Sequence, residues 1–277
     1  PEWEGAARSG FAFHCPPRGM RDGEHEITLI VRANDGSTCE ERFSFEVRRT
    51  EDMGTGAVIR RKVPRVEVAF TDTLLSDLAA KVPFQVLLRV PVMPDSKALA
   101  ATLASLRAQT YKDWRLTVLC EEAEVAQATR TLLREAGAMS LARVLSPSEG
   151  AWTAAFATDP DALYLIMDPG DELAADALAA LALDHGLHPR ADLLYADETR
   201  VSPVSREREA FLKPDFSPDL LLSTNYIGRP WVATGALLGR VAATPSGLAG
   251  SGEYDLVLRC AEQARGIPVS YTHLRAH

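Results

Sequence analysis

Two aspartates stand three residues apart at the end of an apolar run, in the stretch LYLIMDPGDEL that spans Leu163–Leu173. Between Asp168 and Asp171 lie Pro169 and Gly170, two residues that favour a tight turn. Mg²⁺ and Mn²⁺ prefer oxygen ligands and are typically bound by one or two carboxylates together with substrate phosphates. The pattern therefore indicates a site for a divalent metal and a diphosphate. The structural alternative is that Asp171 simply begins the next helix, where the helix dipole favours a carboxylate.

Two further segments carry polar residues that could line a site. Asp197 and Glu198, in the stretch YADETR, stand at the end of another predicted strand and could frame an acceptor pocket or be ordinary loop acids. Asn225 and Tyr226 belong to residues 211–231, a segment too rich in proline and aromatic residues for a plain helix. Loops of such specific composition often line a binding site, although a packed structural loop fits the same composition.

A further pair of carboxylates opens the stretch GSGEYDLVLRCAEQ near the end of the chain. Glu253 and Asp255 stand where helix-capping residues belong, after a glycine-rich approach. A carboxylate at the mouth of a site can instead act as a general base that takes the proton of an incoming hydroxyl group. Both roles are compatible with the sequence, so one of the two residues is a candidate base.

The bulk composition excludes several classes of protein. The chain has 277 residues, a formal net charge of −8, and 46% hydrophobic and 25% charged residues, as expected for a globular protein of about two domains. The acidic balance argues against nucleic-acid binding, which normally needs a basic patch. The four cysteines form no CxxC pair, so neither a zinc cluster nor a disulfide framework is indicated. Because no apolar run approaches the length of a membrane span and no signal peptide is visible, we expect a cytoplasmic protein.

The candidate residues need a scaffold, and the pattern from residue 83 onward supplies one. Apolar runs alternate with amphipathic stretches, which predicts an α/β fold with a mostly parallel sheet. The predicted strands cover residues 84–92, 114–120, 142–146, 162–167 and 191–198. The predicted helices cover residues 95–109, 124–137, 150–158 and 172–186. In such sheets ligands bind beyond the carboxyl ends of the strands, which is where Asp168 stands.

The beginning of the chain follows a different pattern, with alternating stretches at 26–32 and 42–48 joined by the turn-forming residues NDGS. This pattern predicts a β-hairpin, which we interpret as part of a small β-sandwich-like domain over residues 1–50. Residues 51–82 are polar and partly basic, and we interpret them as a linker with a short helix-like segment near 74–80. The α/β domain then covers residues 83–268.

This α/β domain resembles the family 2 glycosyltransferases with the GT-A fold, a Rossmann-like sandwich. It is most similar to the branch that acts on bacterial O-antigen and other surface polysaccharides. The resemblance rests on these blocks, which occur in family order: VPVMPDSKALAATLASLRAQTYKDWRLTVLCEE, LYLIMDPGDELAADAL, DLLYADE, FLKPDFSPDLLLSTNYIG and EYDLVLRCAE. It implies an inverting transfer of a sugar from a nucleotide diphosphate sugar to an acceptor hydroxyl, with Mg²⁺ or Mn²⁺ as cofactor.

On the donor side, the resemblance places Pro91 and Val92 at the nucleotide pocket. It places Glu121 or Glu122 where family acids contact uridine and ribose. The family often has Val-Tyr-Asn after the first strand and a double Asp after the second. This sequence has Val-Met-Pro and Cys-Glu-Glu at those places, so the donor pocket departs from the family pattern.

On the reaction side, Asp168 matches the first acid of the family's metal motif and also contributes to nucleotide-sugar binding. The third position of that motif is Gly170 instead of an acid. Either Asp171 supplies the missing ligand, or Asp168 and the diphosphate hold the metal alone. Glu253 matches the acid usually assigned as catalytic base, and Asp255 stands next to it.

A catalytically inactive glycan-binding module on the same fold is the alternative function, because the substituted motifs are what loss of catalysis would leave. A nucleotidyltransferase shares the architecture, but the NYIG and EYDLVLR blocks speak against it. The expected partners are a nucleotide-sugar donor and a glycan or lipid-linked glycan acceptor. A lipid-linked acceptor leaves peripheral association with the inner face of the plasma membrane open.

The last nine residues, VSYTHLRAH, resemble translated read-through of a sequencing adapter. We therefore expect residues 269–277 to be a non-native tail and the glycosyltransferase-like domain to be truncated at its C-terminal end.

Overall fold

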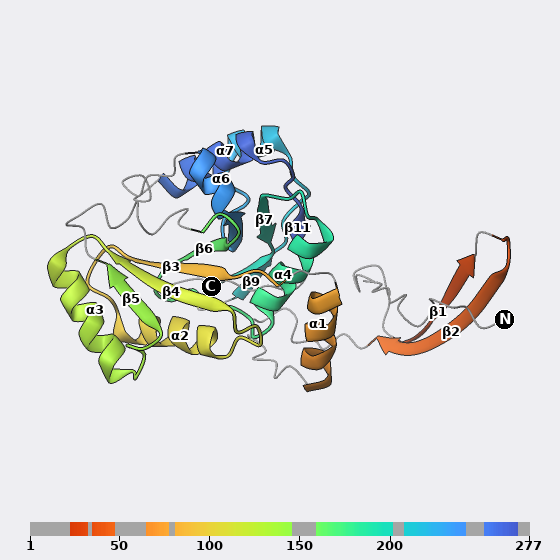
Figure 1. Cartoon of the computed structure of the whole chain (residues 1–277), viewed down its shortest axis with the longest axis horizontal. Coiled ribbons are helices and arrows are strands. Elements are labelled where there is room, and N and C mark those ends of the chain that lie inside the picture. Colours follow the sequence, from red (N-terminus) through yellow and green to blue (C-terminus); the bar gives the residue numbers. More distant parts are fainter. Residues whose placement is uncertain are drawn as a thin grey trace. The chain divides into compact units, whose positions relative to one another are not determined.

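The computed structural model describes residues 23–32, 35–47, 65–77, 81–145, 159–201, 208–241 and 252–270. The chain divides into two compact units, Pro1–Thr55 and Gly56–His277. Figure 1 labels the helices and strands of each unit.

The first unit contains a β-hairpin (Figure 1). β1 (Gly23–Arg32) pairs antiparallel with β2 (Thr38–Val47), from Gly23 opposite Val47 to Arg32 opposite Thr38. The turn between the strands contains Gly36 with a φ of 85°, a conformation that glycine adopts without steric cost. The predicted hairpin is therefore present, and the larger sandwich around it stays a prediction.

The second unit is built on a seven-stranded sheet in the order β11-β7-β10-β6-β3-β4-β5. Its strands are β3 (Phe84–Val90), β4 (Trp114–Cys120), β5 (Ala142–Leu145), β6 (Leu163–Met167), β7 (Leu193–Ala196), β10 (Trp231–Thr234) and β11 (Val269–Ser270). β3 is parallel to β4 and β6, β4 is parallel to β5, and β11 is parallel to β7. β10 runs antiparallel between β6 and β7. The predicted α/β fold with a mostly parallel sheet is confirmed.

Helices cover both faces of this sheet, and Figure 1 shows α6 and α7 on one side and α2 on the other. The helices are α1 (Arg65–Asp77), α2 (Ser96–Arg107), α3 (Ala123–Glu135), α4 (Ala177–Leu187), α5 (Pro218–Ser223), α6 (Gly235–Arg240) and α7 (Gly252–Gln263). Successive residues of β3 alternate between two apolar cores, as the pleat requires. Val86 and Leu88 pack with α1 to α4, whereas Leu87 packs with α5 to α7. Among the described residues, no helix is both long and apolar enough to cross a bilayer.

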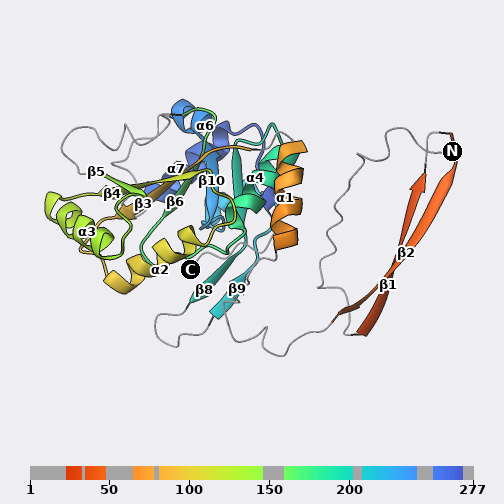
Figure 2. The same ribbon diagram turned by 60° about the horizontal axis from the view of Figure 1, so that its bottom comes forward.

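A second hairpin accompanies the sheet. β8 (Glu198–Val201) and β9 (Arg208–Phe211) pair antiparallel, and Figure 2 shows them next to each other. β8 follows β7 after a single residue, Asp197. Glu198 therefore begins a strand and does not belong to the expected long strand over 191–198.

Several boundaries differ from the sequence predictions. The helix expected near residues 74–80 runs from Arg65 to Asp77, inside the expected linker, and its Leu75 is fully buried in the core of the second unit. The helix predicted from residue 172 begins at Ala177. Two residues of the expected tail, Val269 and Ser270, form β11. The helix predicted over residues 150–158, and the rest of the tail at 271–277, lie outside the described residues.

The direction of β10 decides which residues gather at the edge of the sheet. Parallel strands β3, β4 and β6 all end at one edge, and ligands in such folds bind beyond that edge. Because β10 runs the opposite way, it begins where β6 ends, and Trp231 is its first residue. The residue two positions earlier, Arg229, is thereby brought to the carboxyl ends of the parallel strands.

The loop after β6 is anchored by the end of α2. Gln109 is fully buried, and its amide nitrogen donates to the carbonyls of Ser105 and Ala174 at 3.1 and 2.7 Å. Its amide oxygen accepts a hydrogen bond from the backbone N–H of Leu178 at 3.1 Å. A buried amide with its donors and acceptor satisfied fixes the segments it joins. Gln109 therefore holds the start of α4, and with it the loop that carries Asp168, against α2.

Candidate functional site

Asp168 directly follows β6 and lies beside Arg89 of β3. The guanidinium of Arg89 donates from Nε and Nη2 to the two carboxylate oxygens of Asp168, at 2.9 and 2.8 Å. This is the fork arrangement that makes arginine–carboxylate pairs strong. Burial would raise the pKa of Asp168, but the hydrogen bond from Arg89 and the charge of Arg229 outweigh it, so the net shift is downward.

Asp171 does not begin a helix. Its backbone N–H donates to the carbonyl of Asp168 at 3.0 Å, and its Oδ2 accepts from the N–H of Asp168 at 2.8 Å. The chain makes this turn through Gly170, whose φ is 104° and whose N–H donates to Thr102 Oγ1 at 2.9 Å. The helix-start alternative is therefore wrong, because the carboxylate of Asp171 turns back towards Asp168 and α4 begins later. Burial raises the pKa of Asp171.

Arg229 connects the carboxylates. Its Nη1 is 2.8 Å from an oxygen of Asp168 and 2.8 Å from an oxygen of Asp171. Its Nε donates to Glu253 at 2.9 Å, and its Nη2 donates to the other oxygen of Glu253. Burial alone would lower the pKa of Arg229, but the hydrogen bonds to Glu253 and the nearby negative charges outweigh it and raise the pKa. Arg229 is therefore a permanent cation among three carboxylates.

Glu253 lies in the first turn of α7, and its side chain is 12% exposed. Besides Arg229, it accepts a hydrogen bond from Trp231 Nε1 at 3.0 Å, and it lies 3.7 Å from Arg89 Nη2. Asp255, the other candidate base, is 62% exposed and pairs with Arg259 at 2.9 Å on the surface of the same helix. The structure thus places Glu253 with Asp168 and Asp171 and separates Asp255 from them.

We name these five residues the arginine–carboxylate cluster: Arg89, Asp168, Asp171, Arg229 and Glu253. With two guanidinium groups and three carboxylates, its formal charge is −1. The cluster borders a cavity of about 400 Å³. The residues that line this cavity are Arg89, Asp171, Glu198, Thr199, Arg200, Asn225, Gly228, Arg229, Glu253 and Tyr254.

The four expected acceptor-side residues divide into two pairs. Glu198 and Asn225 line the cavity, and Glu198 accepts a hydrogen bond from the N–H of Arg229 at 3.0 Å. Asp197 instead accepts a backbone hydrogen bond from Lys213 at 2.7 Å. Tyr226 is buried and its hydroxyl accepts from the N–H of Ser217 at 2.8 Å, so it holds the loop before α5.

The expected nucleotide-binding residues lie at the same edge of the sheet but do not line the described part of the cavity. Pro91 and Val92 follow β3, and Val92 is 69% exposed. Glu121 and Glu122 follow β4 and are exposed. The carboxyl ends of neighbouring parallel strands bring these residues to one edge, which is compatible with the donor side that the resemblance implies.

The expected metal position is filled by a side chain. Asp168 and Asp171 have the hard oxygen donors that Mg²⁺ or Mn²⁺ requires. However, the point between their carboxylates is occupied by Arg229 Nη1, and Arg89 binds both oxygens of Asp168. In the described part of the chain, no group of three or more His, Cys, Asp or Glu residues is arranged to hold a metal ion. In this arrangement the carboxylates do not fit a bridging divalent cation.

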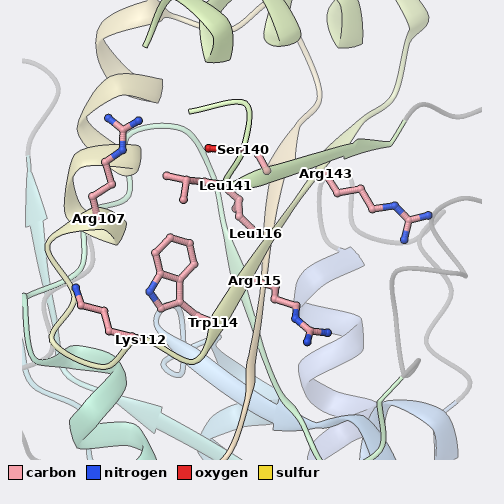
Figure 3. Close-up of a pocket in the computed structure, with 9 residues that line it drawn as sticks. Arg107, Lys112, Trp114, Arg115, Leu116, Ser140, Leu141 and Arg143 are labelled. Atoms are coloured by element: carbon pink, nitrogen blue, oxygen red, sulfur yellow. The ribbon is translucent and has the colours of Figure 1, made fainter. Parts of the chain in front are cut away.

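A larger cavity, of about 620 Å³, lies at the opposite edge of the sheet, where β4 and β5 begin (Figure 3). Its lining includes Trp114 with Arg107, Lys112, Arg115 and Arg143. Figure 3 shows the guanidinium groups of Arg115 and Arg143 pointing away from Trp114, so the cations do not converge. The smaller cavity is the candidate site despite its size, because charged groups converge there beyond the carboxyl ends of the strands.

Arg89 and Arg229 are the members of the arginine–carboxylate cluster that sequence reasoning missed. Arg89 stands inside the mostly apolar run FQVLLRV, and a cation in a buried strand normally needs a carboxylate partner. That signal was available in the sequence. Arg229 carries no comparable signal, because only the antiparallel direction of β10 brings it to the cluster.

Comparisons with known proteins agree with this architecture. No family model matches the chain. The chain is 34% identical over 184 residues to the O-antigen biosynthesis protein RfbC of Myxococcus xanthus. This match covers 64% of this chain and 14% of that protein. It is 31% identical over 182 residues to protein y4gI of Sinorhizobium fredii, covering 64% of this chain and 20% of that protein. The chain thus spans a fifth or less of the length of these curated relatives.

Solved structures share the fold at low sequence identity. TarS 1–349 of S. aureus matches with a TM-score of 0.53 and 15% identity, covering 70% of this chain and 60% of that one. TarS 1–349 has also been solved with UDP and with UDP-GlcNAc. The mannosyltransferase PcManGT of Pyrobaculum calidifontis, solved with GDP-Man and Mn²⁺, matches with a TM-score of 0.50 and 12% identity, covering 77% of this chain and 63% of that one. The second unit therefore has a GT-A-type α/β fold.

Proposed function

We propose that this chain contains a glycosyltransferase domain of family 2, which moves a sugar from a nucleoside diphosphate sugar to an acceptor hydroxyl with inversion at the anomeric carbon. The observation that carries the proposal is the convergence of Glu253 with two arginines on one cavity beyond the carboxyl ends of the sheet. The relative named for O-antigen biosynthesis and the neighbours solved with nucleotide sugars support it.

Glu253 is the proposed catalytic base. An acceptor hydroxyl is a poor nucleophile until a nearby carboxylate takes its proton, and Glu253 lines the cavity in which the acceptor would lie. The acceptor oxygen attacks the anomeric carbon as the bond to the diphosphate breaks, and Glu253 receives the acceptor proton. Trp231 holds the carboxylate from one side by its indole N–H, which fixes its orientation. Glu198 and Asn225 line the same cavity and are the proposed acceptor-side residues.

The donor is proposed to approach from the ends of β3 and β4, past Pro91, Val92, Glu121 and Glu122. A divalent cation at Asp168 and Asp171 stays a prediction of the sequence, and it requires Arg229 to leave its position between them. The proposed product is a cell-surface polysaccharide, built on a glycan or lipid-linked glycan acceptor. This part rests on the relative involved in O-antigen biosynthesis.

The test is release of nucleoside diphosphate from a panel of UDP-, GDP- and dTDP-sugars, with and without Mn²⁺. Glu253→Gln should lower turnover by ~10²–10⁴-fold, because it removes a general base, while donor binding persists. Asp255→Asn is the matched control on the same helix and should turn over at the rate of the unchanged chain. Normal turnover in the Glu253 variant, with loss in the Asp255 variant, would move the base to Asp255.

A glycan-binding module without catalysis is the second candidate function. It is favoured by one specific observation, namely that all three carboxylates of the cluster are engaged by arginine. If the panel gives neither donor binding nor nucleotide release, while immobilised surface glycans retain the chain, this second function replaces the first.

A further inference from the structure

The position of Arg229 bears on how the site handles negative charge. This inference rests on the proposed function, and it deepens it. When a glycosidic bond to a diphosphate breaks, the bonding electrons move to the diphosphate oxygen, and a positive group must stabilise the new charge. A divalent cation held by carboxylates is one solution. Guanidinium groups are another, because they bind phosphate oxygens through paired N–H donors.

The geometry supplies guanidinium groups at the position where the cation is expected. Arg229 Nη1 lies 2.8 Å from both Asp168 and Asp171, so a positively charged nitrogen already bridges the two carboxylates. Arg89 also binds Asp168, in a fork to its two carboxylate oxygens. Both arginines line the 400 Å³ cavity. A metal ion placed between the aspartates would have to displace one guanidinium while lying next to the other.

Two other side chains hold the backbone of Arg229 in place. The backbone N–H of Arg229 donates to Glu198 at 3.0 Å, and its carbonyl accepts from Lys213 Nζ at 2.9 Å. Both of these partners are buried. The backbone is therefore anchored while the side chain, 19% exposed, faces the cavity. An anchored backbone with an accessible guanidinium is the arrangement expected of a residue that binds a ligand anion.

We propose that Arg229 and Arg89 bind the donor diphosphate directly and take the charge-stabilising role of a divalent cation, so that donor binding is independent of metal. In this reaction the guanidinium of Arg229 moves from Glu253 to the diphosphate oxygens. Glu253 is then available as the base. The bond between the anomeric carbon and the diphosphate breaks, the bond to the acceptor oxygen forms, and the acceptor proton goes to Glu253. No metal enters the balance, and Arg229 keeps its protons throughout.

The experiment measures binding of UDP and GDP to the full chain by calorimetry, in EDTA and in Mn²⁺. The expected result is an affinity in EDTA within about three-fold of that in Mn²⁺. Arg229→Gln should weaken binding by about ten-fold or more, because it removes charge-assisted hydrogen bonds to phosphate. Arg229→Lys keeps the charge without the fork and should recover part of the loss. Arg115→Gln, an exposed arginine at the opposite edge of the sheet, is the charge-matched control and should bind as the unchanged chain does.

Each outcome decides between the two proposals. Binding that requires Mn²⁺, or an Arg229→Gln variant that binds as tightly as the unchanged chain, overturns the inference and leaves the glycosyltransferase proposal intact. Binding of neither nucleotide under either condition speaks against the proposed function itself. Circular dichroism of each variant identifies misfolding. If Arg229→Gln misfolds, Arg229→Lys and Arg89→Lys provide the measurement, and full affinity in both overturns the inference.

Discussion

The chemistry of the candidate site depends on one side chain, that of Arg229. It contacts three carboxylates that come from two distant parts of the chain, the loop after β6 and the first turn of α7. The function of an acidic motif depends on the cation beside it, since the same aspartates can bind a metal ion or a guanidinium. For this reason Asp168 and Asp171 cannot be assigned from their own spacing.

Lys213 donates a hydrogen bond to the backbone carbonyl of Arg229 and provides a test of the site's electrostatics. Its side chain is fully buried, and its ammonium group lies 3.5 Å from Glu198. Burial lowers the pKa of Lys213 from 10.5 to about 8, although the charge of Glu198 works in the opposite direction. Between these two pH values the unfolded chain holds a proton at this position that the folded chain has released.

Raising the pH should therefore stabilise the fold through Lys213. Because the unfolded state binds more protons between pH 8 and pH 10.5, the free energy of unfolding rises with pH in that window. From pH 7 to pH 9.5 it should rise by about 1–2 kcal/mol relative to Lys213→Met, which does not titrate. Urea denaturation of both proteins at the two pH values measures this difference. A difference that stays constant with pH would show that the pKa of Lys213 is the same in the folded and the unfolded chain.

At the scale of elements, the loop between β6 and α4 decides the form of the acidic motif. Gly170 has a φ of 104°, outside the left-handed helical region that Asp or Asn tolerates. A side chain built there would meet Ala98 Cβ only at an ordinary distance of 3.7 Å, so the constraint comes from the backbone. The glycine is present because the turn that places Asp171 requires it, and an acid at this position would strain the turn.

Placing an acid at Gly170, the third position of the motif, should therefore lower the free energy of unfolding without creating a metal site. We expect Gly170→Asp and Gly170→Asn to lose about 1–3 kcal/mol each, because both impose the same backbone strain. Thermal denaturation with and without Mn²⁺ distinguishes strain from ligation. Selective stabilisation of the Asp variant by Mn²⁺ would mean that this position can hold a metal after all.

The sequence predicts the helices and strands better than it predicts which of their residues come into contact. The strands β3, β4, β5, β6 and β7 follow from apolar runs, and their ends correctly place Asp168 at the edge of the sheet. The approach of Glu253 to that edge was expected only from the family resemblance, because α7 is far away in sequence. β10 was not predicted because it has only four residues, three of them apolar, and is followed at once by α6. The direction of a strand is also not visible in its composition. Arg229 was missed for that reason.

At the scale of the whole molecule, the second unit has two apolar cores of its own. Both apolar cores of the second unit are built from described residues between Leu75 and Val269. The chain also spans only a small part of its curated relatives. Both cores lie within the second unit, Gly56–His277.

Residues 56–277 alone should therefore retain the properties of the candidate site. We expect this fragment to bind UDP or GDP with the affinity of the full chain, and to unfold within about 2 °C of it, because it keeps the described residues of both apolar cores. Calorimetry and thermal denaturation of the two proteins side by side test the prediction. A clear loss of affinity in the fragment would show that residues 1–55 contribute to the donor or acceptor site.

Trp231 makes changes in the arginine–carboxylate cluster measurable by fluorescence. Its indole is 1% exposed, and its N–H donates to Glu253 at 3.0 Å. Indole emission responds to charge placed near the ring, so removing a guanidinium from Glu253 or adding a proton to it changes the spectrum of this tryptophan. The order of these two events can therefore be followed in real time by stopped-flow fluorescence without an attached dye. Trp231→Phe would identify the part of the signal that belongs to the site.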